Sequence, residues 1–100
     1  MAAGKKPKRY QFASSIDLTA AFSSFEIEYL TVSESRVIAI YTQSILNIEV
    51  EDGSLENARI LDVEVLDHSS RVGDDDPTDL VQTMIGQISR STGADFREIR

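Results

Sequence analysis

The sequence contains no cysteine and no tryptophan, and its 100 residues include only two prolines and five glycines. Without cysteine the chain has neither a disulfide framework nor a thiolate metal site, so packing or association with another chain must hold its core together. The absence of disulfides is typical of a reducing compartment, and we expect a cytoplasmic protein. Five scattered glycines form neither a P-loop nor a dinucleotide-binding fingerprint, and we expect no cofactor.

Long apolar runs are also missing. The longest run, Val37 to Tyr41, is far shorter than the roughly 20 residues that cross a bilayer, and we expect no membrane association. Apolar residues nevertheless make up 41% of the chain and recur with the periods of strands and helices. This pattern predicts one globular domain rather than a disordered chain.

Positive charge is concentrated at the start of an acidic chain. The net charge is −7, and four of the ten basic residues precede position 10, whereas all seventeen acidic residues follow it. Residues 1–9 show no apolar periodicity, so we predict a flexible basic tail before a single domain over residues 10–100. The tail residues Lys5, Lys6, Lys8 and Arg9 resemble a short nuclear-localisation signal and suit contacts with phosphates. A nucleic-acid-associated protein, nuclear if the signal is read, is therefore one hypothesis.

Alternation of apolar and polar residues predicts most of the strands. It runs from Tyr10 to Leu18 and again over residues 25–29. Residues 46–51 and 61–65 alternate on either side of Asp52-Gly53-Ser54, which predicts an antiparallel hairpin. The small residues 19–24 predict a turn, with one helical turn as the alternative.

The segment from Val37 to Tyr41 is apolar on both parities, which predicts a central strand covered on both faces. A helix over residues 33–48 is the alternative, because Thr31 and Glu34 match a capping box. The β-branched content favours the strand.

One helix is clearly predicted near the end of the chain. Asp76 suits the N-cap, Pro77 the first helical position and Gly93 the stop. The apolar stripe of this helix consists of Leu80, Val81, Met84, Ile85 and Ile88. Gly86 interrupts the helix and predicts close backbone packing against the sheet or a partner. Phe96 and Ile99 indicate a short last strand, so we expect an α+β fold in which one C-terminal helix covers a mostly antiparallel sheet of four to five strands.

Three pairs of acidic residues occur at strand spacing. They are Glu26/Glu28, Glu49/Glu51 and Asp62/Glu64. Residues i and i+2 of a strand share a face about 6.6 Å apart, so neighbouring strands would form an acidic sheet face, with Arg36 and Arg59 as counter-charges. Such a face suits a partner with a basic surface, whereas the simpler reading is a solvated face of the sheet.

The sequence shows no residue set that carries a catalytic reaction. His68 is the only histidine and lies in a polar stretch without a recognisable nucleophile turn. Asp74, Asp75, Asp76 and Asp79 lack the ligand spacing of a calcium loop and suit helix capping better, so we expect no metal site. We expect a protein that is not an enzyme; a small enzyme with carboxylates and His68 at a dimer interface is the alternative.

The main functional prediction is a non-enzymatic protein-interaction module, acting as an adaptor, inhibitor or regulatory subunit. Its acidic sheet face would bind a protein with a basic surface. A strand that needs cover on both faces, in a chain with one predicted helix, also predicts a homodimer formed by sheet extension or by stacking of a second copy.

Overall fold

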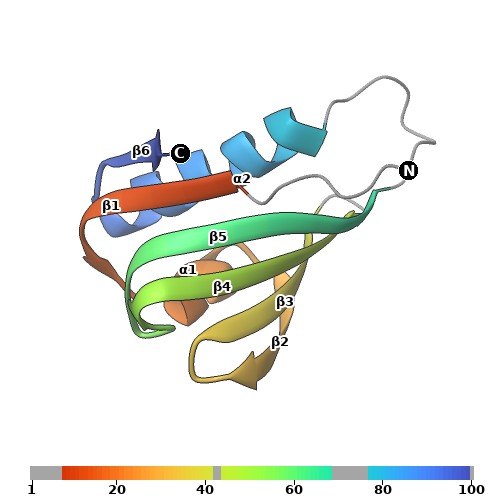
Figure 1. Ribbon diagram of the computed structural model, residues 1–100, viewed down its shortest axis with the longest axis horizontal. Coiled ribbons are helices and arrows are strands. Elements are labelled where there is room, and N and C mark those ends of the chain that lie inside the picture. The colour runs from red at the N-terminus through yellow and green to blue at the C-terminus, as the bar shows by residue number, and fades with distance from the viewer. Residues whose placement is uncertain (1–7, 42–43, 69–76, 100) are drawn as a thin grey trace.

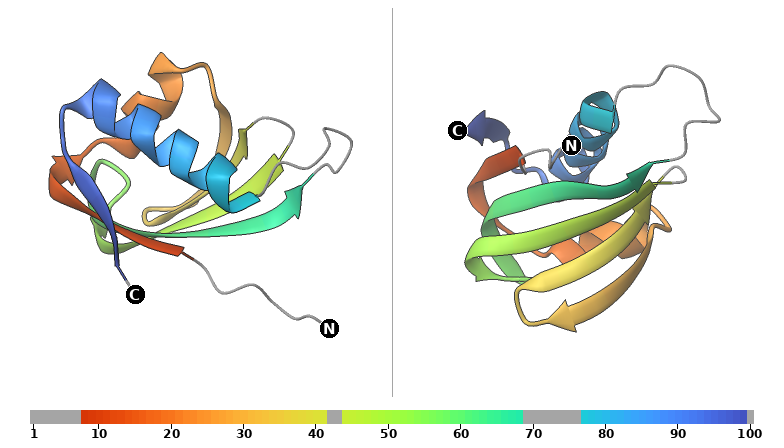
Figure 2. Two further views of the ribbon diagram at one scale, coloured as in Figure 1. Left: turned by 90° about the horizontal axis from the view of Figure 1, so that it is seen from above. Right: turned by 45° about the vertical axis from the view of Figure 1, so that its right-hand side comes forward.

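The computed structural model describes residues 8–41, 44–68 and 77–99. Within these residues the chain forms two layers, an antiparallel sheet of six strands and two helices that lie on one face of it (Figures 1 and 2). The elements in chain order are β1 (Lys8–Ile16), α1 (Leu18–Ser24), β2 (Glu28–Ser33), β3 (Arg36–Tyr41), β4 (Ser44–Ser54), β5 (Asn57–His68), α2 (Pro77–Thr92) and β6 (Phe96–Ile99). The predicted α+β class is confirmed, whereas the predicted numbers of strands and helices are too small.

The strand order is β2-β3-β4-β5-β1-β6. The first and last strands of the chain therefore lie side by side, after α2 has crossed the helical face of the sheet (Figure 1). The β4–β5 hairpin is confirmed and pairs Leu46, Ile48 and Val50 with residues of β5. This order leaves β2 at one edge of the sheet and β6 at the other.

The core lies between the helices and one face of the sheet, which we call the inner face. Helix α2 contributes Val81, Met84, Ile85 and Ile88, which are buried at the spacing of one helical stripe. The inner face contributes Tyr10, Phe12, Val37, Ala39, Leu46, Ile48, Leu61 and Val63. The start of α2 at Pro77 and its stop at Gly93, which has a φ of 77°, agree with the sequence, while Asp76 lies outside the described residues.

Helix α1 corrects the prediction of a turn after the first strand. Asp17 is its N-cap, because the Asp17 Oδ1 atom accepts hydrogen bonds from the Ala20 backbone N–H at 3.0 Å and from the Thr19 hydroxyl at 2.9 Å. Leu18 and Phe22 are then buried on the same side of the helix. The alternation that placed Leu18 in a strand was therefore misleading, since spacing of four residues also fits a helical face.

Strand β2 begins at Glu28, so the strand predicted over residues 25–29 is largely wrong. The chain first makes a tight turn, in which the backbone N–H groups of Phe25 and Ile27 both donate to the Phe22 carbonyl oxygen. Glu26 takes a φ of 60°, in the left-handed region, at this turn. These N–H groups would donate to a neighbouring strand if the segment were part of the sheet. Here they donate to a carbonyl group at the end of α1 instead.

The segment from Arg36 to Tyr41 is a strand, as the sequence favoured, and the helical alternative is wrong. Its predicted cover on both faces is also wrong. Val37 and Ala39 are fully buried against the helices, whereas Ile40 on the opposite face is 47% exposed. No helix within the described residues covers that opposite face, which we call the outer face (Figure 2).

Two further predictions need correction. Lys8 and Arg9 belong to β1, so the predicted tail extends too far into the domain, and residues 1–7 lie outside the described residues. Gly86 does not mark close packing among the described residues, because none of their atoms outside the helix's own backbone lies within 4 Å of the position that a Cβ atom would take.

Candidate functional site

The outer face carries a row of four charged residues across neighbouring strands. Arg36 of β3 lies opposite Glu49 of β4, Glu49 lies opposite Asp62 of β5, and Asp62 lies opposite Arg9 of β1. Directly opposite residues share a face of an antiparallel sheet, so two carboxylates lie between two arginines. The two negative charges at the centre of the row are thereby flanked by one positive charge on each side.

Arg9 and Asp62 form the closest ion pair of this row. The Arg9 Nε atom lies 2.7 Å from Asp62 Oδ1, and Nη2 lies 3.0 Å from Oδ2, so the guanidinium donates to both carboxylate oxygens. The hydrogen bonds from Arg9 lower the pKa of the Asp62 carboxyl. Hydrogen bonding to Asp62 and the negative charge of Asp62 raise the pKa of the neighbouring Glu51.

Four of the six predicted partner contacts come together around this row. They are Glu49, Glu51, Asp62 and Glu64, and we call them the acidic cluster. Glu64 lies opposite Asn47, one step further along the face than Asp62. Among the described residues Asp62 is paired with Arg9, whereas no ion pair joins Glu49, Glu51 or Glu64 to a cation.

The other two predicted contacts lie elsewhere. Glu26 is in the turn before β2, and Glu28 lies opposite Ile40 at the far side of the sheet. Of the predicted counter-charges, Arg36 is in place and donates its Nε–H to Asn47 Oδ1 at 2.6 Å. Arg59 is not part of the cluster, because its Nη2 atom instead approaches the Ala13 carbonyl oxygen at 3.4 Å.

Two of the four cations predicted to contact nucleic acid are engaged inside the domain. Arg9 binds Asp62 as above, and the Lys8 ammonium lies 3.2 Å from Glu98. Lys5 and Lys6 lie outside the described residues. The contacts predicted between these four cations and nucleic acid stay a prediction, because an ion pair at the protein surface does not exclude them.

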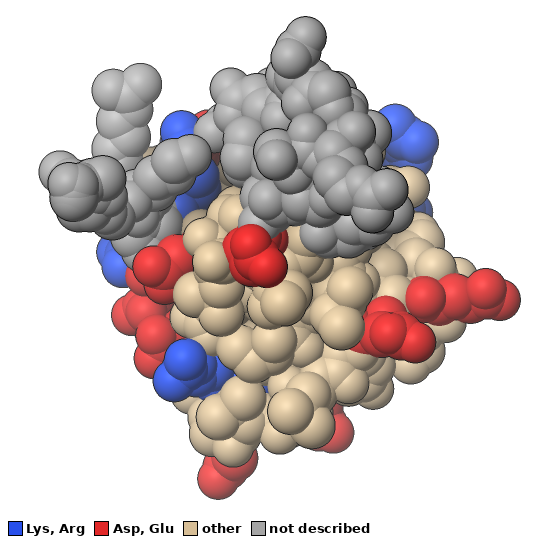
Figure 3. Space-filling view, turned by 90° about the vertical axis from the view of Figure 1, so that its right-hand side faces the viewer, with Lys and Arg blue, Asp and Glu red and all other residues tan. Residues whose placement is uncertain are grey.

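An exposed apolar patch lies on the outer face, where the sequence predicted that β3 would be covered. Leu30 of β2 lies opposite Ile38 of β3, and Ile40 of β3 lies opposite Ile45 of β4, so these four side chains share the outer face. We call them the apolar patch; Leu30 is 68% exposed and Ile45 36%. On the side of the molecule in Figure 3, uncharged surface lies between groups of acidic side chains. The sequence signal for this patch was that successive residues of β3 are apolar, so that both of its faces carry apolar side chains.

The described residues hold neither a group of three or more His, Asp or Glu side chains able to bind a metal ion nor a helix long and apolar enough to cross a membrane. Asp74 to Asp76 lie outside them, and His68 is the last residue of β5.

No protein-family model, curated protein or solved structure matches this chain. The geometry of the outer face is therefore the basis for assigning a function.

Proposed function

We propose that this protein is a non-enzymatic interaction module that binds another protein on the outer face of its sheet. The observation that carries the proposal is the apolar patch of Leu30, Ile38, Ile40 and Ile45, uncovered and directly beside the acidic cluster. Contiguous apolar surface with a polar border is typical of protein interfaces. The role would be that of an adaptor, an inhibitor or a regulatory subunit.

The charges beside the patch favour a partner with a basic rim. Glu51 and Glu64 extend the acidic cluster without a cation of their own, and Glu28 lies at the other side of the patch, opposite Ile40. Electrostatic complementarity contributes mainly to specificity and to the rate of association, whereas the buried apolar centre contributes most of the affinity. The partner surface would thus present an apolar centre flanked by Lys or Arg.

Site-specific crosslinking tests this interface. A photoreactive residue at Ile40 should crosslink a basic partner in lysate, while the same residue at Glu56, in the exposed β4–β5 turn, should not. The triple variant Glu49→Gln, Glu51→Gln and Glu64→Gln should lose that product. The matched control is Glu26→Gln, Glu34→Gln and Glu56→Gln, which removes the same charge from turns and should retain it.

Identical products from positions 40 and 56 would overturn the interface. Equal loss of the product in the two triple variants would overturn the role of the acidic cluster, because it would show an effect of net charge alone.

A second candidate, self-association, is favoured by the edge strand β2. All six of its residues are exposed, and it contains neither proline nor lysine, which protect many edge strands from pairing. In an antiparallel pair of two identical strands, opposite residues must share a face, so a two-fold register can be centred on Leu30. Glu28 would then lie opposite the partner's Val32, and the two apolar patches would join.

Sedimentation equilibrium tests the dimer. The wild-type protein should dimerise, and Leu30→Lys should shift it to monomer because two lysines would oppose each other at the centre. Glu56→Lys makes the same substitution type in a turn and should leave the dimer unchanged. A wild-type protein that stays monomeric at high protein concentration would exclude this candidate.

A further inference from the structure

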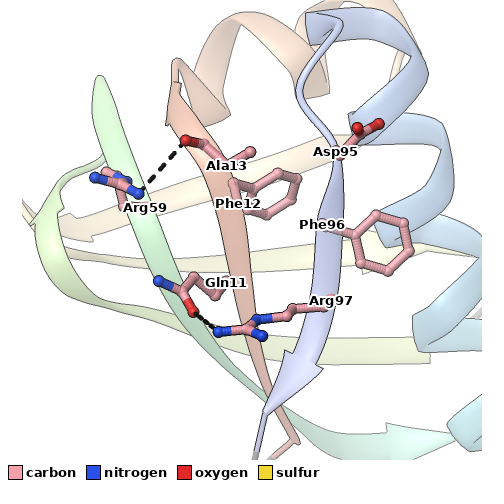
Figure 4. A pocket seen from close by; sticks show the side chains of 7 residues that line it. All are labelled: Gln11, Phe12, Ala13, Arg59, Asp95, Phe96 and Arg97. Carbon is pink, nitrogen blue, oxygen red and sulfur yellow. Dashed lines mark hydrogen bonds between the residues drawn. The ribbon is translucent and has the colours of Figure 1, made fainter.

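A pocket opens at the other end of the sheet, between β1, β5 and β6. It has a volume of about 270 Å³ and is lined by residues 11–13 of β1, Arg59 of β5 and residues 95–97 at the start of β6 (Figure 4). The strand order separates it from the apolar patch, because the patch lies on β2, β3 and β4 whereas the pocket lies on β5, β1 and β6.

An irregularity in β1 creates the pocket. Gln11 pairs with Ile60 of β5, but the next paired residue is Ile16, opposite Ala58, so the intervening segment leaves the β5 ladder. Ala13 instead donates its backbone N–H to the Asp95 carbonyl oxygen at 2.8 Å. Bulges of this kind open a sheet locally and redirect side chains.

Two arginines approach this opening from opposite sides of β1. Arg97 reaches across from β6 and donates from Nη2 to the Gln11 Oε1 atom at 3.2 Å. Arg59 comes from β5 and donates from Nη2 to the Ala13 carbonyl oxygen at 3.4 Å. Figure 4 shows both guanidinium groups directed toward β1.

Neither of these guanidinium groups is neutralised within the described residues. The ion pairs there join Lys8 to Glu98 and Arg9 to Asp62, whereas Arg59 and Arg97 contact only uncharged oxygens. A guanidinium has five N–H donors, so most donors of both side chains have no partner in this part of the chain. The Asp95 carboxylate points away from both groups in Figure 4.

We propose that this pocket binds a small oxyanion, a phosphate or carboxylate group of a small molecule, between Arg59 and Arg97. The planar fork of a guanidinium matches the oxygens of either group, and two forks suit a doubly charged anion. Gln11 is a positioning residue that holds the Arg97 side chain over the pocket. The volume lies just below the range for drug-sized ligands, so the ligand is a small molecule rather than a polymer.

Titration followed by NMR tests the site with three probes at constant ionic strength: inorganic phosphate, phenyl phosphate and succinate. We expect saturable shifts of the backbone amides of Ala13 and Arg97 with at least one probe. Comparison of phenyl phosphate with succinate then distinguishes a phosphate site from a dicarboxylate site, and inorganic phosphate shows how much of the affinity the phosphate group supplies.

Matched variants distinguish specific binding in the pocket from non-specific attraction of the anion by positive charge. Arg59→Gln and Arg97→Gln should each weaken binding at least about tenfold, since each removes a charge-assisted hydrogen bond to the anion. Arg36→Gln removes the same charge on the outer face and should leave affinity within about twofold. Gln11→Ala should weaken binding while leaving the thermal unfolding midpoint unchanged.

Two results would overturn the proposal. One is the absence of saturable shifts with all three probes at millimolar concentrations. The other is an equal loss of affinity in Arg36→Gln and in the two pocket variants, which would show non-specific attraction. Because Arg59 and Arg97 are both exposed, the variants are expected to fold, and their thermal unfolding would verify this.

Discussion

Arg9 and Asp62 join the first strand of the chain to the fifth through two parallel hydrogen bonds of 2.7 and 3.0 Å. The sequence suggested opposite roles for them, with Arg9 in a basic tail for nucleic acid and Asp62 on an acidic face for a protein. In the structure each one neutralises the other. The outer face is therefore less acidic at its centre than the sequence implied, and among the described residues Glu49, Glu51 and Glu64 are the carboxylates of the acidic cluster without an ion pair.

The first prediction concerns the pH dependence of this pair. Because Arg9 lowers the pKa of Asp62, the pair stabilises the fold above the ordinary carboxyl value of about 3.9 and this contribution is lost as pH falls below it. Arg9→Gln should therefore lower the thermal unfolding midpoint at neutral pH, with the difference from wild type shrinking toward pH ~2. Arg59→Gln, which removes an arginine without a carboxylate partner, should show no such pH-dependent difference. A difference independent of pH would contradict this assignment.

The second prediction concerns the buried hydroxyl of Tyr10. Tyr10 is fully buried, and its hydroxyl has no hydrogen-bond partner among the residues that the structure describes. A buried polar group without a partner costs about 1–3 kcal/mol, so Tyr10→Phe should raise the free energy of unfolding by about 1 kcal/mol in urea denaturation. A destabilised variant would show that the hydroxyl has a partner after all.

Alkaline titration gives an independent readout of the same substitution. Burial raises the pKa of Tyr10 from 10.0 to about 12, so ionisation favours the unfolded chain as pH rises through that interval. Wild-type stability should fall between these values, and the fall should be smaller in Tyr10→Phe. It should not vanish, because burial also raises the pKa of Tyr41.

The third prediction concerns the glycine inside α2. A Cβ atom at Gly86 would meet no described atom outside its own helix within 4 Å, so Gly86→Ala should stabilise the protein by roughly 0.5–1 kcal/mol through helix propensity alone. Chemical denaturation measures the change. Gly53→Ala is the contrasting control and should destabilise, because Gly53 has a φ of 104° and a Cβ atom there would collide with the Asn57 carbonyl oxygen. A destabilised Gly86→Ala would indicate that a partner packs on this helix face.

The fourth prediction concerns the cap of α1. Asp17→Ala removes the acceptor of the Ala20 N–H and Thr19 hydroxyl bonds and should cost about 1 kcal/mol of unfolding free energy. Asp17→Asn retains a capping oxygen and should cost less than half of that. Equal losses in the two variants would indicate that the charge of Asp17, rather than its capping bond, stabilises the helix.

The local sequence pattern predicted those elements whose backbone hydrogen bonds join residues close together in the sequence. The β4–β5 hairpin and α2 were predicted in type and approximate place, because alternation on both sides of a glycine turn and an apolar stripe ending at Gly93 are specific patterns. Helix α1 was predicted only as the alternative to a turn, although its capping residue Asp17 is visible in the sequence. Its seven residues are too few to show a clear period, so the tertiary burial of Leu18 and Phe22 decides their conformation.

The candidate site was predicted only where two strands are neighbours in sequence. Glu49, Glu51, Asp62 and Glu64 share a face because β4 and β5 form one hairpin. Glu26 was misplaced because the turn after α1 continues past it and β2 begins only at Glu28. The apolar patch could not be located from the sequence alone, because its exposure depends on both helices covering the same face of the sheet.

The sequence by itself determined a small acidic α+β domain, the hairpin, the main helix and a solvated acidic strand face, since all of these follow from periods of two and 3.6 residues. The tertiary structure decided which strand lies beside which. Only the insertion of β1 between β5 and β6 brings Arg9 to Asp62 and places Arg59 and Arg97 at one pocket. Contacts between residues far apart in the sequence depend on how the layers bury their apolar faces together, which no local pattern encodes.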